Sequence, residues 1–564
     1  MNLLENYERW LRCATADPAL QEELQEITGQ ASEIEDRFYR ELEFGTAGLR
    51  GVLGAGTNRM NVYTVGRATQ GYCAYLLRRS KDPSVAIAYD SRRNSTRFAE
   101  YAASIFAGNG IRVHLYRQLM PTPCLSFAVR YFHCDGGINV TASHNPAQYN
   151  GYKVYGPDGC QITSQAAEEI LSCIAETDMF DGVKTIPLET ALERGIVSYI
   201  GEEAIEAYLQ AIDRESLLDD AVPRDFAIVY TPLNGAGISC VPQSLARNGF
   251  TKLQIPEAQK HPNGDFPTCP YPNPEIRQTL DVAIRCAEET GAAYVLATDP
   301  DCDRVGTAVK VDDTFHLISG NQMGVLLLDY ICRMRLQRGR MPAEPVAVKT
   351  IVTTKMAERV AAHYGVRMFN VLTGFKYIGE QIALLERQGG LDRYIFGFEE
   401  SYGYLSGTEV RDKDAVNSSL LICEMFAWYR AQGKTPLDGL QEAYQTFGCY
   451  TEKLMNFTFE GAAGFRQMQR MMGALRERVF TEIAGIPVET ARDYLADGTG
   501  LPKADVMQYH LKGGTVVTVR PSGTEPKLKI YLSACGETCA HSAEVVAALE
   551  SALNQWVEKV KARA

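Results

Sequence analysis

The chain has 564 residues, of which 45% are hydrophobic and 22% are charged, and its formal net charge is −12. Because a single hydrophobic core stops growing near ~250–300 residues, this length predicts three to five domains. The acidic balance argues against a general nucleic-acid or anionic-membrane binder, although a local group of basic residues can still bind an anionic substrate.

Residues 1–30 have an acidic, helical pattern without the basic and apolar segments of a secretory signal. No apolar run approaches the ~20 residues that a membrane span needs, so no membrane partner is expected. The 15 cysteines are scattered from Cys13 to Cys539 without a C-x-x-C pair. This pattern is typical of reduced, buried thiols in a cytoplasmic protein, which we expect here.

One pattern occurs three times along the chain: a short apolar strand, a polar loop, an amphipathic helix that ends at a Gly, and a second strand. It begins at Val85, Phe226 and Val346, and each copy predicts a β-loop-α-β unit. The spacing is too long for a solenoid and fits successive homologous domains. Further along, two strands around the loop PSGTEPK and a final helix from about Ser542 predict a smaller domain built on a hairpin.

We therefore expect an α/β protein with four domains. The first three are predicted to be tandem α/β domains over residues 1–200, 201–320 and 321–447. The last, over residues 448–564, is predicted to be an α+β domain.

The loop Thr141–Pro146 (TASHNP) follows a strand-like segment. Small and polar residues that end at a Pro predict a tight, exposed loop, which would present the Ser143 hydroxyl. A turn serine that caps backbone amides is the alternative. A serine hydrolase fits less well, because there is no G-x-S-x-G elbow, and neighbours in an extended segment point in opposite directions, so His144 is not expected to be the base of Ser143.

Three aspartates, Asp299, Asp301 and Asp303, alternate directly after an apolar strand. In an extended turn such residues face the same way, so their carboxylates would converge. A hard divalent cation is the natural partner of such a cluster, and a solvated acidic turn is the alternative. An EF-hand is excluded because Arg304 and Lys310 stand where its Gly and Glu are required.

Two further loops suit a phosphorylated sugar. Glu399 and Ser401 follow a strand-like segment and could bond to sugar hydroxyls, although helix capping explains them equally well. The segment from Arg520 to Lys527 (RPSGTEPK) combines hydroxyls, a Gly and cations, as in an anion-binding nest. An ordinary β-turn is the alternative for this segment.

Together and in this order, the four motifs TASHNP, DPDCDR, GFEES and RPSGTEPK resemble those of the α-D-phosphohexomutase superfamily, and within it the phosphoglucomutase-2-like branch. The resemblance also includes Gly45–Arg50 and Gly151–Tyr155, and it extends over residues 44–533. It implies a heart-shaped molecule of four domains, with the active site in a central cleft and one loop supplied by each domain. A hinge near residue 447 would let the last domain move.

The resemblance also implies roles for individual residues. Ser143 would be a phosphoserine, whose phosphate completes a Mg²⁺ site with Asp299, Asp301 and Asp303. The residues around the transferred group would be Arg50, His144, Lys153 and Arg304, with Lys153 as the candidate that handles the hydroxyl proton. The sugar and its other phosphate would be bound by Gly374, Lys376, Glu399, Ser401, Arg520, Ser522, Gly523, Thr524 and Lys527.

The implied activity is that of a phosphoglucomutase, which interconverts glucose 1-phosphate and glucose 6-phosphate through a bisphosphorylated sugar, with glucose 1,6-bisphosphate as activator. Cys302 replaces a common Ala in the metal loop, and its small side chain is expected to point away from the cation. Ala415 replaces a Gly, and the segment 372–377 differs from the specificity loop of phosphomannomutases, so mannose phosphate is less favoured. A phosphopentomutase or phosphomannomutase remains an alternative, as do a magnesium-dependent sugar phosphatase with Asp299 as nucleophile and an inactive sugar-phosphate sensor.

Overall fold

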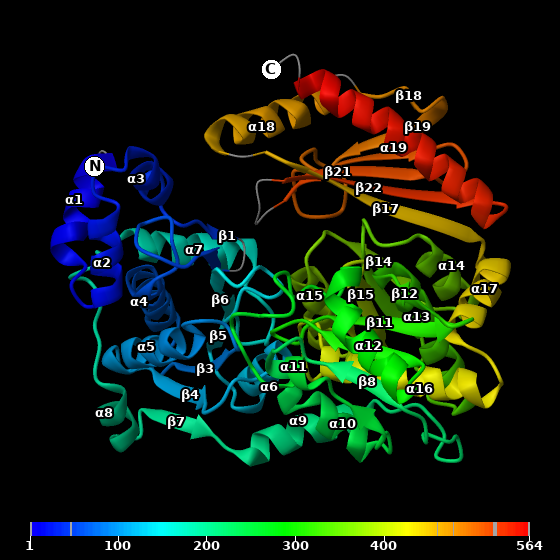
Figure 1. Ribbon diagram of the computed structural model, residues 1–564, viewed down its shortest axis with the longest axis horizontal. Helices are drawn as coiled ribbons and strands as arrows, with labels where there is room; N and C mark the ends of the chain where they lie inside the picture. Colours follow the sequence, from blue (N-terminus) through cyan, green and yellow to red (C-terminus); the bar gives the residue numbers. More distant parts are fainter. Residues whose placement is uncertain (1–2, 46–47, 460, 478, 523–526, 562–564) are drawn as a thin grey trace.

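The computed structural model describes residues 3–45, 48–459, 461–477, 479–522 and 527–561. Within these ranges the chain forms four β-sheets with helices packed against them (Figure 1). The predicted α/β class is confirmed. None of the helices in these ranges combines the length and the apolar composition that a membrane span requires.

The first sheet has seven strands in the order β1-β2-β6-β5-β3-β4-β7. Its strands are β1 (Phe44–Gly45), β2 (Gly48–Val52), β3 (Ser84–Tyr89), β4 (Arg112–Tyr116), β5 (Gly136–Val140), β6 (Tyr149–Tyr155) and β7 (Val197–Ile200). Strand β3 is parallel to β4 and β5 and is buried along its whole length, as a central strand covered on both faces should be. The unit predicted at Val85 is thus β3, the helix α5 (Ser95–Gly108) and β4.

The other helices of this first part are α1 (Leu3–Cys13), α2 (Pro18–Glu26), α3 (Ala31–Phe38), α4 (Val62–Arg79), α6 (Thr122–Tyr131), α7 (Ser164–Ala175) and α8 (Leu188–Glu193). Helix α4 begins with a capping box between Asn61 and Thr64. The N-terminal helices pack onto α4 through aromatic side chains, since Trp10 contacts both Phe38 and Tyr63 edge to face. Figure 1 shows these helices, in dark blue, at the outer end of the molecule.

The second sheet has the order β12-β11-β10-β8-β9, and the third has the order β14-β13-β15-β16. Their strands are β8 (Ile228–Thr231), β9 (Leu253–Gln254), β10 (Tyr294–Thr298), β11 (Val305–Val311), β12 (Thr314–Ile318), β13 (Val346–Thr350), β14 (Arg367–Val371), β15 (Tyr394–Glu399) and β16 (Gly403–Leu405). The units predicted at Phe226 and Val346 correspond to β8-α10-β9 and β13-α14-β14, and both strand pairs are parallel.

The helices around these two sheets are α9 (Glu202–Arg214), α10 (Val241–Arg247), α11 (Glu257–Lys260), α12 (Asp281–Thr290), α13 (Gly320–Gln337), α14 (Met356–His363), α15 (Phe375–Arg387), α16 (Ala415–Ala431) and α17 (Pro436–Phe447), with short 3₁₀ turns at Ala236–Ser239, Arg277–Leu280 and Leu391–Arg393. Helix α16 is apolar on most sides and almost fully buried, and the Asp414 side chain caps its first turn.

The last sheet is antiparallel, with the order β17-β22-β21-β20-β19-β18. Its elements are β17 (Cys449–Thr458), β18 (Glu482–Ile483), β19 (Ile486–Asp493), β20 (Met507–Leu511), β21 (Val516–Pro521), β22 (Lys527–Gly536), α18 (Gly461–Glu477) and α19 (Cys539–Lys561). Helices α18 and α19 cover one face of this sheet (Figure 1). The predicted hairpin is the pair β21 and β22, and the predicted final helix begins at Cys539.

The last domain also packs on the third sheet. Ile351 and Leu372 share a small apolar cluster with Val506 and Tyr531, and Gln508 Nε2 donates to the Ile351 carbonyl at 3.1 Å. These contacts join the last sheet to the segments that follow β13 and β14.

The cysteines correct one expectation. Thirteen are free and ten of these are buried, as predicted. Cys449 and Cys539, however, form a disulfide with Cα atoms 4.9 Å apart, so the expectation of reduced thiols is wrong for this pair. The two cysteines are 90 residues apart in the sequence and come together only because α19 packs along β17, so the sequence pattern did not indicate the pair.

Candidate active site

Ser143 lies in the turn between β5 and β6. Its backbone is left-handed, with φ +52°, and its N–H donates to Thr141 Oγ1 at 2.8 Å. The Ser143 hydroxyl donates to Asp299 Oδ2 at 2.9 Å. Only 3% of the residue is exposed, so the prediction of an exposed loop is wrong, because the metal loop of the second sheet covers the serine.

Arg92, which was not predicted from the sequence, binds the backbone of this loop. Its guanidinium donates to the carbonyls of Pro146 at 2.9 Å and Tyr149 at 3.0 Å, and also to those of Ser143 and Asn145. The arginine is buried, with only 3% exposed. A planar group with several N–H donors suits four carbonyls that lie close together in a turn.

His144 contacts Ser143 directly, with Nδ1 3.2 Å from the serine Oγ. The expectation that the two side chains point apart is wrong, because the left-handed backbone at Ser143 removes the alternation of an extended segment. Burial lowers the pKa of His144 well below its usual value, and the charges of Arg304 and Arg50 lower it further. The imidazole is therefore neutral at pH 7.

The three aspartates converge as predicted, but for a different reason. The segment is a tight turn in which the Cys302 N–H donates to the Asp299 carbonyl at 2.9 Å, with Cys302 in the left-handed region at φ +54°. Asp299 Oδ1 accepts the backbone N–H groups of Asp303 and Arg304, each at 3.1 Å. Cys302 is fully buried in the apolar core, which agrees with the expectation that it points away from the carboxylates.

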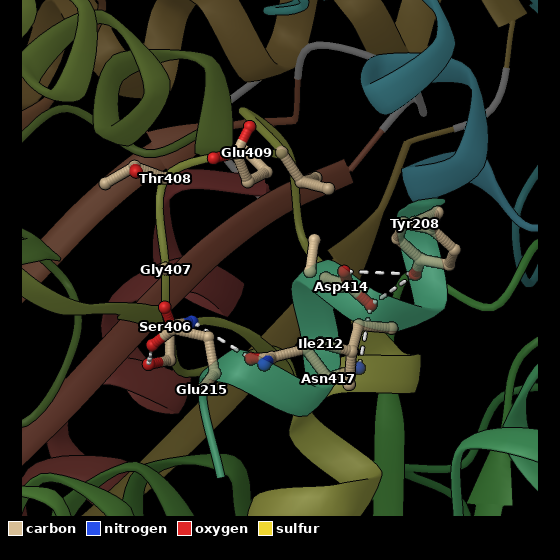
Figure 2. Close-up of a pocket in the computed structure, with 11 residues that line it drawn as sticks. Tyr208, Ile212, Glu215, Ser406, Gly407, Thr408, Glu409, Asp414 and Asn417 are labelled. Carbon is tan, nitrogen blue, oxygen red and sulfur yellow. Dashed lines mark hydrogen bonds between the residues drawn. The ribbon is translucent and has the colours of Figure 1, made fainter. Parts of the chain in front are cut away.

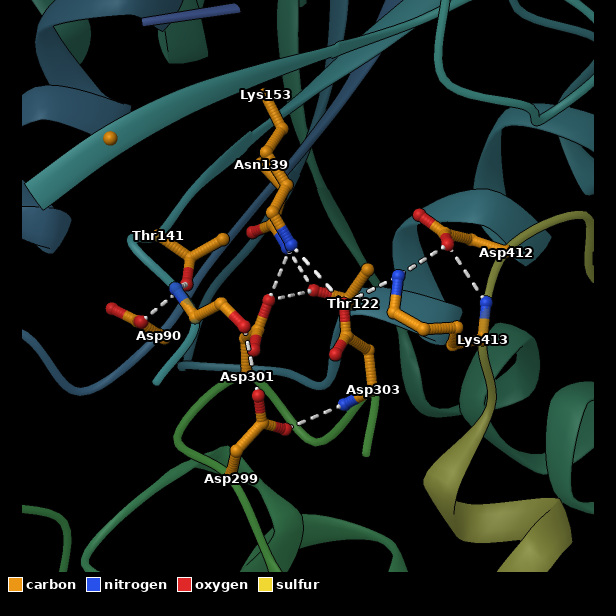
Figure 3. A network of polar contacts seen from close by, with 12 residues as sticks. Asp90, Thr122, Asn139, Thr141, Lys153, Asp299, Asp301, Asp303, Asp412 and Lys413 are labelled. Carbon is orange, nitrogen blue, oxygen red and sulfur yellow. Dashed lines mark hydrogen bonds and ion pairs between the residues drawn. The ribbon is translucent and has the colours of Figure 1, made fainter. Parts of the chain in front are cut away.

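Figure 3 shows two lysines among these carboxylates. Lys153 Nζ lies 2.7 Å from Asp301 Oδ2 and 3.2 Å from Asp303 Oδ2. Lys413 Nζ lies 3.2 Å from the same Asp303 oxygen and 3.0 Å from Asp412 Oδ1. Lys413 was not among the site residues predicted from the sequence.

Burial and neighbouring charges shift the pKa values of these groups in different directions. Burial and repulsion from Asp301 and Asp303 raise the pKa of Asp299 well above its usual value. Burial also favours the protonated form of Asp303, but Lys413, Lys153 and Arg304 more than offset this and lower its pKa. Burial lowers the pKa of Lys153, yet the two aspartates reverse the effect and leave it raised. Lys153 is therefore charged in this arrangement.

The aspartates fit a hard cation. One oxygen from each of the three can lie within 4.8 Å of the others. Among the residues that the structure describes, Asp301 Oδ1 and Asp303 Oδ1 are buried without a hydrogen-bond partner. Unpaired buried carboxylate oxygens are costly unless a ligand completes them, and oxygen donors are those that Mg²⁺ and Ca²⁺ prefer.

Two arginines extend the site. Arg50 Nη1 donates to Asn145 Oδ1 at 3.4 Å, beside the serine loop. Arg304 Nε lies 3.6 Å from Asp303 Oδ1, and its Nη1 lies 3.3 Å from Glu275 Oε1. The positive charge of Arg304 also acts on Glu399, whose pKa burial raises. Arg304 thus links the metal loop to the predicted sugar loop.

Glu399 ends β15 and is buried, and its Oε1 accepts the N–H of Gly374 at 2.9 Å. This bond brings together two predicted sugar-binding segments that are 25 residues apart. Lys376 lies in the first turn of α15, with its amine 5.1 Å from the Tyr377 ring centre, and Ser401 lies in the turn between β15 and β16.

The predicted phosphate loop joins β21 to β22. Ser522 N donates to the Lys527 carbonyl at 2.7 Å, which closes the loop at its base. Burial raises the pKa of Glu400, and the charge of Arg520 lowers it in part, so Arg520 acts on the residue that follows Glu399. Gly523 and Thr524 lie outside the described residues.

A small pocket lies beside Lys413, between α9 and the loop 406–410 (Figure 2). Tyr208 on α9 donates its hydroxyl to both oxygens of Asp414, at 3.0 and 3.1 Å. Burial raises the pKa of Asp414 to about 6. None of the predicted site residues lines this pocket, whose wall includes Asp414, the neighbour of Lys413.

Models of the phosphoglucomutase/phosphomannomutase family match the chain in four consecutive segments. These are α/β/α domain I over residues 41–180, α/β/α domain II over 206–312, α/β/α domain III over 319–447 and the C-terminal domain over 454–549. The match covers the loops that carry Ser143, the aspartates, Glu399 and Arg520.

Relatives and solved structures agree with these models. A phosphoglucomutase from Staphylococcus haemolyticus is 35% identical over 515 residues, which cover 88% of this chain and 91% of the relative. A phosphoglucomutase from Staphylococcus aureus is 35% identical over 522 residues, with 89% and 92% covered. The fold matches that of parafusin, a phosphoglucomutase from Paramecium, with a TM-score of 0.67 at 18% identity, over 93% of this chain and 95% of that one.

The chain therefore belongs to the α-D-phosphohexomutase superfamily, in its phosphoglucomutase/phosphomannomutase family. It is an enzyme of the mutase class that transfers phosphoryl groups. The resemblance that the motifs indicate is confirmed, as is the arrangement of three α/β domains followed by a C-terminal domain.

Proposed function

We propose that this chain is a phosphoglucomutase that interconverts glucose 1-phosphate and glucose 6-phosphate through a phosphorylated Ser143. The observation that carries the proposal is the 2.9 Å bond between the Ser143 hydroxyl and Asp299, which sets the serine against a buried triad of carboxylates. The 35% identity to phosphoglucomutases favours glucose over a pentose or mannose.

The cofactor in this proposal is Mg²⁺. Asp299, Asp301 and Asp303 would hold it together with an oxygen of phosphorylated Ser143, in agreement with the unpaired buried oxygens of two of these aspartates. When bound, the cation would supply Lewis-acid neutralisation of the charge on the transferring phosphoryl group.

In the reaction, the bond between phosphorus and Ser143 Oγ would break while a bond to a sugar hydroxyl oxygen forms, and the proton lost by that hydroxyl would end on Ser143 Oγ, which is released as a free hydroxyl. The product of this half-reaction is glucose 1,6-bisphosphate, which turns end for end and returns its other phosphoryl group to the serine. Phosphoryl transfer depends mainly on alignment and charge neutralisation. We assign charge neutralisation to Lys153, Arg304 and Arg50, and we keep Lys153 as the candidate that handles the proton of the sugar hydroxyl. The proton exchange at Ser143 is assigned to the adjacent His144, whose Nδ1 lies 3.2 Å from Oγ.

The remaining residues would bind the sugar and its second phosphate. We assign the sugar hydroxyls to Glu399 and Ser401, with Gly374 and Lys376 beside them, because the Gly374 N–H orients Glu399. The phosphate that does not react is assigned to the loop between β21 and β22, which supplies Arg520, Ser522, Gly523, Thr524 and Lys527. A segment that combines cations, hydroxyls and a Gly suits a phosphate.

We also propose the domain limits 1–200, 201–320, 321–447 and 448–564. Gly448, with φ +96°, joins α17 to β17 and would be the hinge between the last two domains. Release of one end of the bisphosphate and capture of the other require the last domain to move.

Ser143→Ala tests the proposal against a phosphatase that uses Asp299 as nucleophile. With glucose 1-phosphate and glucose 1,6-bisphosphate, S143A is expected to lose mutase turnover, whereas a phosphatase would keep its release of inorganic phosphate. Full mutase turnover by S143A would refute the phosphoserine. Turnover of wild-type enzyme on glucose 1-phosphate, mannose 1-phosphate and ribose 1-phosphate then tests the sugar, and a large preference for the pentose would contradict glucose.

A further inference from the structure

Besides Lys153, a second residue of the first domain donates hydrogen bonds to Asp301, and none of the four motifs contains it. Thr122, the first residue of α6, is fully buried and donates its hydroxyl to Asp301 Oδ2 at 2.8 Å (Figure 3). Its backbone N–H donates to the Asp301 carbonyl, also at 2.8 Å. One residue therefore holds both the main chain and the side chain of an aspartate that is 179 residues away in the sequence.

The hydroxyl proton of Thr122 is committed to Asp301. Asn139, on β5, donates its Nδ2 to Thr122 Oγ1 at 2.6 Å and so occupies an acceptor position of the hydroxyl. A hydroxyl has one proton and an ionised carboxylate can only accept, so the proton points to Asp301 Oδ2. Lys153 also donates to this oxygen, at 2.7 Å, but it shares its ammonium group with Asp303.

The two oxygens of Asp301 therefore differ. Oδ2 has two donors, whereas Oδ1 is buried and lacks a hydrogen-bond partner among the described residues. The terminal torsion of an aspartate is broad when nothing holds it. Fixing Oδ2 leaves Oδ1 as the oxygen that can meet a further ligand.

We propose that Thr122 is a positioning residue for the cation site, because its hydroxyl fixes the Asp301 carboxylate so that Oδ1 stays available within the triad. The inference rests on the magnesium site of the proposed function. Groups that orient metal ligands in this way typically contribute about 10–100-fold to metal affinity.

The test compares three variants of the full-length, dephosphorylated enzyme by calorimetric titration with Mg²⁺. Thr122→Val removes the hydroxyl but keeps the shape and the N–H, and Thr122→Ser keeps the hydroxyl. The matched control is Thr279→Val, since Thr279 is also buried and donates its hydroxyl to a carbonyl, that of Tyr271 at 3.0 Å. We expect T122V to bind Mg²⁺ about 10–100-fold more weakly, and T122S and T279V to bind it as the wild type does.

A kinetic measurement separates positioning from general damage. Turnover of T122V should need more Mg²⁺ and should recover at saturating Mg²⁺, with an unchanged KM for the sugar phosphate. Added metal would not restore an enzyme that is merely misfolded. If T122V does not fold, Thr122→Ala makes the same comparison.

Wild-type Mg²⁺ affinity in folded T122V would overturn the inference, as would a loss in T122S as large as that in T122V. Asp301→Asn distinguishes this failure from that of the proposed function. If wild-type binding is lost in D301N but kept in T122V, only the role of Thr122 is refuted. If the wild type itself does not bind Mg²⁺, the magnesium site is refuted, and the role of Thr122 with it.

Discussion

Replacing Arg92 by Lys is expected to disable the serine loop while leaving the sugar site in place. The guanidinium donates to four carbonyls between Ser143 and Tyr149, and a single ammonium cannot reach all of them. Hydrogen bonds that involve a charged group contribute about 1.5–3 kcal/mol each, so the loss of two costs about 3–6 kcal/mol. A domain has only about 5–15 kcal/mol of stability, so the loop should loosen well before the rest of the chain.

The assay measures kcat and KM on glucose 1-phosphate together with urea unfolding. Misplacement of a reacting group by about 1 Å can lower the rate about 10²-fold, and we expect a fall of this order in kcat for R92K, with KM little changed. Arg93→Lys is the matched control, because Arg93 is 60% exposed and pairs with Asp265 on the surface, where an ion pair contributes about 0–1 kcal/mol. If R92K has the kcat and the unfolding midpoint of R93K, the proposed role of Arg92 in holding the serine loop is refuted.

Three further predictions concern pH, redox state and metal. The native pKa of Asp414 is raised from 3.8 to about 6, so between these values the native state holds a proton that the unfolded chain releases, and stability falls as pH rises, by about 3 kcal/mol in all. Asp414→Asn should flatten this dependence, and the same pH profile in both proteins would contradict the assignment. Reduction of the Cys449–Cys539 disulfide, which closes a 90-residue loop, should destabilise the last domain by up to about 4–5 kcal/mol. Without reductant, Cys449→Ser should have the unfolding midpoint of reduced wild type, whereas the control Cys286→Ser should keep the midpoint of oxidised wild type. An unfolding midpoint of the wild type that does not change with reductant would refute the effect. Removal of divalent cations with EDTA should lower turnover at least ~10²-fold, since a catalytic cation contributes several kcal/mol, and added Mg²⁺ should restore it; turnover that survives EDTA would contradict a metal-dependent reaction.

The sequence was sufficient for the fold and for the residues that act together within one loop. Three aspartates at alternate positions could be recognised as a candidate cation site, because the chemistry of crowded carboxylates does not depend on how the chain brings them together. The local geometry was predicted less well. The left-handed backbone at Ser143 and Cys302 turns extended segments into tight turns, and a periodicity argument cannot show such a residue.

Residues whose partners lie far along the chain were missed for a different reason. In the sequence, Arg92 is 51 residues from Ser143, the first residue whose carbonyl it binds, and Lys413 is 110 residues from Asp303. In the sequence, neither residue can be distinguished from a charged residue on the surface, because its partners are brought close only in the folded chain. The partners of such buried cations are set by packing, and a pattern within one segment gives no information about them.

The most direct test of the central claim is to locate the phosphoryl group on the enzyme. Wild-type protein incubated with glucose 1,6-bisphosphate and Mg²⁺ should gain one phosphoryl group, which mass spectrometry of its peptides should assign to Ser143. Addition of glucose 1-phosphate should then remove it and yield the bisphosphate. A phosphoryl group found on Asp299, or turnover that proceeds while Ser143 is never phosphorylated, would contradict the mechanism.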